Sequence, residues 1–124
     1  MPSHLKPSVL IVEDEPLIAI DTEDLVKDLG YEVIDTAGSV CAALEALSQR
    51  RPDIVLLDVL LRSETSLLVA ERCRSLGIGL AFTTGFPARD LPVGCGDAPV
   101  LAKPFSAEEL RRTLHRVAEA RPKG

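Results

Sequence analysis

The sequence predicts one α/β domain, in which helices cover both faces of a parallel sheet. Five short apolar runs alternate with segments of helical periodicity, an order typical of repeated βα units. Three of these runs, the first, third and fourth, are almost entirely apolar, as strands buried on both faces are. The chain has 124 residues, of which 46% are hydrophobic, and this suits one domain with one core.

The predicted strands occupy residues 8–12, 32–37, 54–57, 80–83 and 100–102. The run at 32–37 alternates in polarity, which favours a place at the edge of the sheet. The helices are expected at 16–29, 39–50, 66–76 and from 106 onward. Pro16 opens the first helix, Ser39 can cap the second, and Gly77 closes the third. Ser106 and Glu109 form a capping-box pattern at the start of the last.

One stretch departs from this pattern. Residues 85–99, GFPARDLPVGCGDAP, hold three prolines and three glycines. Proline removes a helix donor and glycine raises the entropy lost on ordering. We therefore expect irregular backbone here, or a helix of no more than about two turns.

Composition narrows the classes of function. The 14 Lys and Arg residues against 19 Asp and Glu give a net charge of −5, which disfavours direct binding to DNA. No apolar run approaches the roughly 18 residues of a membrane span, and the first residues lack a signal-peptide core. Three cysteines without C-x-x-C spacing are expected to be free thiols. These features predict a cytoplasmic protein that binds neither DNA nor membrane.

Chemistry-bearing residues follow the predicted strands. Glu13 and Asp14 follow the first strand, Asp58 ends the third, Thr84 follows the fourth and Lys103 follows the fifth. Parallel strands bring their carboxyl ends to one edge, so these side chains should meet. Three carboxylates against one ammonium leave about two excess negative charges, which a hard divalent cation such as Mg²⁺ would offset. Hydroxyl and ammonium donors suit phosphoryl oxygens, so a phosphoryl site beside a metal is predicted.

Each residue also has an ordinary structural explanation. Glu13 and Asp14 could favour the start of a helix, and Asp58 could be a solvated residue at a strand end. Thr84 could be a turn residue and Lys103 a surface lysine. Their joint placement on one edge of the sheet argues for the site.

Four stretches, VLIVEDEP, PDIVLLDVLL, AFTTGF and VLAKPFSAEEL, occur in this order. Together they resemble the receiver domain of bacterial two-component response regulators, over residues 8–120. The resemblance implies a flavodoxin-like sheet of order 2-1-3-4-5. It also implies that residues 1–124 form a single receiver domain without an effector domain. Such a protein is not an enzyme, apart from catalysing its own phosphorylation and dephosphorylation.

The resemblance assigns roles to individual residues. Asp58 would be the phosphoacceptor. Asp14 and Asp58 would bind Mg²⁺ directly, Glu13 would act through water, and the backbone carbonyl of Leu60 would complete the protein ligands. Thr84 would donate a hydrogen bond to the phosphoryl group.

Lys103 would form an ion pair with the phosphoryl group, and the Lys103–Pro104 peptide bond would be cis. The FTTGF stretch resembles a receiver subgroup marked by Phe-Ala-Thr-Gly, often stand-alone and with an altered fourth helix. Two features depart from the common pattern. Val100 stands where many receivers have an aromatic switch residue, so Phe86 is the alternative candidate. The DVLLRSETS stretch lacks the usual Pro-Gly loop.

The implied partners are a sensor histidine kinase or phosphotransfer protein, and a protein that receives the output. Output would be protein binding or onward transfer of the phosphoryl group. Two other functions stay open. One is a degenerate receiver that binds partners without phosphorylation. The other is an aspartyl-phosphate phosphohydrolase, which usually needs an acid at the position of Leu60.

Overall fold

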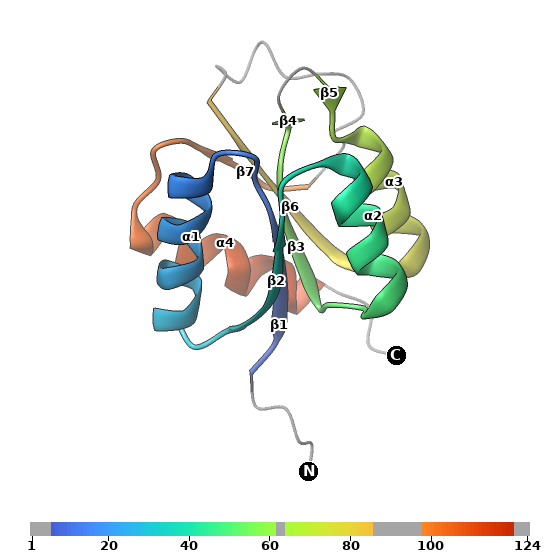
Figure 1. Cartoon of the computed structure of the whole chain (residues 1–124). Coiled ribbons are helices and arrows are strands. Elements are labelled where there is room, and N and C mark those ends of the chain that lie inside the picture. Colours follow the sequence, from blue (N-terminus) through green and yellow to red (C-terminus); the bar gives the residue numbers. More distant parts are fainter. Residues whose placement is uncertain (1–5, 62–63, 86–97, 121–124) are drawn as a thin grey trace.

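A parallel five-stranded sheet forms the centre of the protein (Figure 1), and its strand order is β2-β1-β3-β6-β7. The computed structural model describes residues 6–61, 64–85 and 98–120. The sheet strands are β1 Ser8–Val12, β2 Glu32–Ala37, β3 Ile54–Asp58, β6 Gly79–Thr84 and β7 Val100–Ala102. Because β6 and β7 are the fourth and fifth strands of this sheet, the predicted order 2-1-3-4-5 is confirmed. The more polar β2 lies at an edge, as its alternating sequence predicts.

In the part of the chain that the structure describes, four helices pack on the sheet in two layers. They are α1 Pro16–Asp28, α2 Val40–Gln49, α3 Leu67–Leu76 and α4 Ala107–Ala120. In Figure 1, α1 and α4 cover one face, and α2 and α3 cover the other. Successive residues of β1 face opposite layers, so Val9 and Ile11 pack with α1 and α4, whereas Leu10 and Val12 pack with α2 and α3. The central strands are thus buried on both faces, as their apolar sequences predict.

Local sequence signals set the helix ends. Ser39 Oγ accepts a hydrogen bond from the Ala42 amide at 3.1 Å, which caps α2. At α4, the Ser106 amide donates to Glu109 Oε1 at 2.9 Å and the Glu109 amide donates to Ser106 Oγ at 3.1 Å. The predicted capping box is therefore confirmed. Gly77 ends α3 with φ of 71°, a left-handed conformation that glycine adopts without a Cβ clash.

The sequence did not predict a small antiparallel pair between β3 and α3. Its strands are β4 Leu60–Leu61 and β5 Glu64–Thr65, and Leu60 pairs with Thr65. Two residues per strand give too few positions for any recognisable periodicity. The predicted helix boundaries are also corrected by a residue at several ends, because Ser39, Ser66 and Ser106 each stand one residue before the helix begins.

Two predictions fall on the part of the chain between β6 and β7. Most of the expected irregular segment, including the switch candidate Phe86, lies outside the described residues. The other candidate, Val100, lies in edge strand β7 and is 39% exposed. None of the described helices combines the length and apolar character needed to cross a membrane.

Candidate functional site

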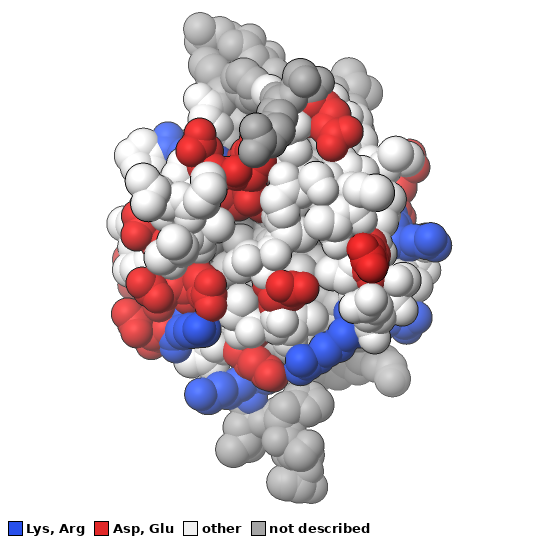
Figure 2. Space-filling model, viewed as in Figure 1, with Lys and Arg blue, Asp and Glu red and all other residues white. Residues whose placement is uncertain are grey.

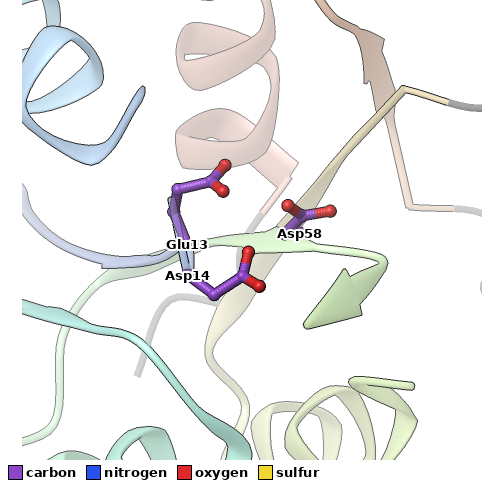
Figure 3. A group of neighbouring side chains, drawn as sticks. All are labelled: Glu13, Asp14 and Asp58. Atoms are coloured by element: carbon purple, nitrogen blue, oxygen red, sulfur yellow. The ribbon is translucent and has the colours of Figure 1, made fainter. Parts of the chain in front are cut away.

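The predicted acidic residues meet where the strands end. Glu13 and Asp14 follow β1, and Asp58 is the last residue of β3. Figure 3 shows their three carboxylates facing a common space. One oxygen from each lies within 4.8 Å of the others. Parallel pairing of β1 with β3 brings these residues together, since Val12 stands opposite Leu57.

Lys103 joins two of these carboxylates. Its Nζ donates to Glu13 Oε1 and to Asp58 Oδ2, each at 2.7 Å. The lysine side chain is 17% exposed, and those of Glu13 and Asp58 are 5% and 9% exposed. Charge-assisted hydrogen bonds in such shielded surroundings are stronger than those at an open surface. The ammonium therefore joins the carboxylate that follows β1 to the carboxylate that ends β3.

Burial and hydrogen bonding shift two pKa values in this cluster. Burial raises the pKa of Glu13, and the hydrogen bonds from Lys103 and from the Glu15 amide offset this only in part. Burial alone would lower the pKa of Lys103, but its hydrogen bonds to Asp58 and Glu13 outweigh burial and raise it. Lys103 thus stays protonated at neutral pH. Glu13 also holds the start of α1, because its Oε2 accepts from the Glu15 amide at 3.1 Å.

The hydroxyl-bearing Thr84 lies at the same edge. It ends β6 and is 2% exposed, and its carbonyl accepts a hydrogen bond from the Lys103 amide at 2.8 Å. Its neighbour Thr83 pairs with Asp58 across the sheet. The five residues predicted to meet at this edge are therefore all placed there.

Leu60 lies next to the acidic cluster. Its amide donates to Asp58 Oδ1 at 3.3 Å. The assignment of its carbonyl as a metal ligand stays a prediction. The Lys103–Pro104 peptide bond is cis, as the resemblance implies.

A residue that sequence reasoning missed lies beneath this edge. Ser66 is fully buried, and its Oγ donates to the carbonyl of Asp58 at 2.6 Å and lies 3.1 Å from that of Val59. The sequence predicts Ser66 only as the first residue of a helix. No periodicity or spacing marks a hydroxyl that turns toward a strand eight residues earlier.

An apolar surface adjoins the site on α1. Leu17 is 75% exposed, Ile20 is 54% exposed and Ile18 is 36% exposed. An open hollow of about 450 Å³ lies between α1 and the segment that follows β7. Its lining includes Ile18, Lys103 and Phe105. Figure 2 shows acidic side chains near the upper edge of the visible face, where the strands end, beside a largely uncharged surface.

The sheet order and the acidic cluster at its carboxyl edge define a receiver-type, flavodoxin-like fold. The chain belongs to the response regulator receiver domain family, whose pattern it matches over residues 9–115. The resemblance described above is thereby confirmed.

Named relatives and solved structures agree with this family. The chain is 35% identical over 106 residues to transcriptional regulatory protein PdtaR of Mycobacterium tuberculosis, covering 82% of the chain and 52% of that protein. It is 35% identical over 119 residues to phyllosphere-induced regulator PhyR of Methylorubrum extorquens, covering 90% and 43%. The chain thus spans about half the length of these relatives.

Two receiver structures match nearly end to end. The PhyR receiver domain of Erythrobacter litoralis is 30% identical, with a TM-score of 0.82 and coverage of 96% of this chain and 95% of that one. SdrG of Sphingomonas melonis is 35% identical, with a TM-score of 0.80 and coverage of 90% and 96%.

Proposed function

We propose that the protein is a phosphoacceptor module of a two-component or phosphorelay system, and that Asp58 accepts the phosphoryl group. The contact that carries this proposal is the 2.7 Å hydrogen bond from Lys103 Nζ to Asp58 Oδ2, at an edge that also holds Glu13 and Asp14. A structural salt bridge alone would not need two further carboxylates beside it, because they add repulsion. Membership of the receiver family supports the same conclusion.

The site suits Mg²⁺. Its oxygen donors are those that a hard cation prefers, and the three carboxylates lie close enough to share one ion. Asp14 and Asp58 would hold it directly, Glu13 through water, and Leu60 through its carbonyl. When bound, Mg²⁺ would offset negative charge on the phosphoryl oxygens.

Asp58, Lys103 and Thr84 each have a separate role in the phosphoryl transfer. A carboxylate oxygen of Asp58 attacks phosphorus and forms an O–P bond. The P–N bond of the phosphohistidine breaks, and its electron pair returns to the imidazole. Lys103 shifts a hydrogen bond from the Asp58 carboxylate to a phosphoryl oxygen, and the Thr84 hydroxyl donates to another. Catalysis here is positioning and charge stabilisation. Water later cleaves the acyl phosphate and returns Asp58 to its free carboxylate.

Intact-mass measurement after incubation with acetyl phosphate and Mg²⁺ tests this function. The wild type should gain one phosphoryl group, and Asp58→Asn should gain none. Asp53→Asn, at the opposite end of β3, is the matched control and should still be phosphorylated. A wild type that gains no mass would favour a degenerate receiver that acts only by binding.

We further infer that a histidine kinase or phosphotransfer protein docks on α1. Leu17 and Ile20 are exposed apolar residues near the site, and such grouped residues favour contact with a protein. A donor placed there could reach Asp58 beside Lys103. Because kinases of this type present their histidine inside the cell, we place the protein in the cytoplasm. Its output would then be contact with a second protein or onward transfer.

Phosphotransfer from a cognate kinase tests the docking surface. Leu17→Ser combined with Ile20→Ser should slow transfer by about tenfold or more, since interface anchors contribute most of the binding energy. Phosphorylation by acetyl phosphate should be unchanged. The control is Leu68→Ser, because Leu68 is 62% exposed on α3. Equal transfer to the double variant and the wild type would place the donor elsewhere.

A further inference from the structure

Ser66 occupies an unusual place for a serine at the start of a helix. It immediately precedes α3, yet its side chain makes no capping hydrogen bond to that helix. Instead its hydroxyl turns toward the end of β3, where it donates to the Asp58 carbonyl at 2.6 Å. The Ser66 amide also donates to the Val59 carbonyl at 3.1 Å. The buried hydroxyl therefore forms its hydrogen bond with the strand that ends in Asp58 and not with its own helix.

The direction of the Asp58 carbonyl explains how it comes to face Ser66. The Val59 amide donates to the Thr83 carbonyl of β6 at 2.9 Å. In a trans peptide the preceding carbonyl points the opposite way, here away from β6. On that side, the pairing of β1 with β3 ends at Leu57. A buried carbonyl without a donor is destabilising, and the Ser66 hydroxyl provides a short hydrogen bond to this one.

We propose that Ser66 is a positioning residue for Mg²⁺ binding and for phosphorylation of Asp58, an inference that rests on the proposed function. The Asp58–Val59 peptide is held between two fixed points, the Thr83 carbonyl on β6 and the Ser66 hydroxyl before α3. Asp58, which bears the carboxylate, precedes that peptide, and Val59 follows it and connects it to Leu60. The orientation of the peptide thus sets the distance between the carboxylate and the Leu60 carbonyl.

Removing the hydroxyl would leave this peptide held at one of its two points, the Thr83 carbonyl, so its orientation would be less fixed. The carboxylates themselves would remain, so the site would keep its charge and lose its geometry. Partners that orient the ligands of a metal affect its affinity by about 10- to 100-fold when they are removed. Ser66→Ala should therefore weaken Mg²⁺ binding by about tenfold or more.

The test compares Ser66→Ala with Val69→Ala. Val69 is fully buried in the first turn of α3, so its truncation destabilises the same helix without touching the Asp58 carbonyl. Mg²⁺ affinity is measured by calorimetry, unfolding by urea titration, and phosphorylation by acetyl phosphate at low and at saturating Mg²⁺. Both variants should lose stability. Only Ser66→Ala should lose Mg²⁺ affinity, and saturating Mg²⁺ should restore part of its phosphorylation rate.

Wild-type Mg²⁺ affinity in Ser66→Ala would overturn the inference, as would an equal loss in Val69→Ala. If Ser66→Ala does not fold, Ser66→Gly removes the same hydroxyl at a position where glycine is tolerated before a helix, and it is judged by the same criteria. A wild type that neither binds Mg²⁺ nor gains a phosphoryl group would instead overturn the proposed function. The two failures are therefore distinguishable.

Discussion

The aspartates at the two ends of β3 have opposite surroundings. Asp53 precedes the strand, and its Oδ2 accepts from the Ser8 amide at 2.8 Å and from the Ser8 hydroxyl at 3.2 Å. The Asp53 amide in turn donates to Ser8 Oγ at 3.0 Å. Asp58 ends the strand and shares one ammonium with Glu13, while the Asp14 carboxylate lies close by.

This contrast separates a structural carboxylate from the proposed phosphoacceptor. At the amino end, the carboxylate and its two donors form a reciprocal link between the starts of β1 and β3. At the carboxyl end, three carboxylates face one ammonium, so repulsion remains that a bound cation would relieve. Sites that act on ligands often keep such unfavourable arrangements at the expense of stability. The same residue type on the same strand can therefore hold the sheet together or serve chemistry.

The largest expected effect is the loss of metal binding in Asp14→Ala. The variant removes a proposed direct ligand and one negative charge, so calorimetry should detect no Mg²⁺ binding and phosphorylation should stop. The free energy of unfolding in metal-free buffer should stay the same or rise, because like-charge repulsion falls. Asp53→Ala, at the other end of β3, should bind Mg²⁺ as the wild type does. Unchanged affinity in Asp14→Ala would contradict the ligand assignment.

Lys103→Met should reduce the free energy of unfolding in metal-free buffer by about 3 kcal/mol, because it leaves two shielded carboxylates without their shared cation. Adding Asp58→Asn should recover part of this loss, since only one carboxylate of the pair then stays charged. Urea titration of the two variants measures both values. If the second substitution recovers nothing, repulsion between Glu13 and Asp58 is not the cause.

A smaller loss is expected at the amino end of β3. Asp53→Ala should reduce the free energy of unfolding by about 1–3 kcal/mol, because the partly buried donors of Ser8 lose a charged acceptor. Asp58→Ala should cost less, since its removal also relieves repulsion from Glu13 and Asp14. Parallel urea titrations give the comparison. A greater loss in Asp58→Ala would reverse the distinction between the two ends.

The smallest effect concerns pH. Burial raises the pKa of Glu13 above its ordinary value of 4.5. Just above pH 4.5, the folded protein therefore keeps a proton that the unfolded chain has released. The free energy of unfolding should fall as pH rises through this window. Metal-free urea titrations from acidic to neutral pH should show a shallower fall in Glu13→Gln. If the free energy of unfolding depends on pH in the same way in both proteins, Glu13 is not the source of that dependence.

Much of this architecture follows from patterns of sequence. The apolar strands β1, β3 and β6 have lengths and flanking signals that predict central positions, and the capping residues of α2 and α4 mark their starts. The topology of the parallel sheet then predicts that Asp58 and Lys103 lie together, and this prediction needs no knowledge of side-chain conformation. For this reason the five residues at the carboxyl edge could be predicted.

The remaining features depend on contacts that leave no local pattern. The β4–β5 pair has two residues in each strand, so no periodicity announces it. Ser66 looks like a helix cap, and only the packed structure turns its hydroxyl toward β3. The link between Ser8 and Asp53 joins residues 45 positions apart. The simultaneous hydrogen bonds from Lys103 to Glu13 and Asp58 likewise depend on the position of its ammonium in the folded chain.

Helix α1 carries exposed apolar residues that do not belong to the core. Its buried residues are Thr22 and Val26, whereas Leu17 and Ile20 stand mostly in solvent. Substitution of either exposed residue opens no cavity, so natural variation there is filtered by recognition and hardly by folding. On the docking surface proposed above, a duplicated gene could therefore diverge at these two positions and acquire a different donor, while the proposed acceptor site stayed intact. New signalling routes can arise in this way without a loss of foldability along the evolutionary path.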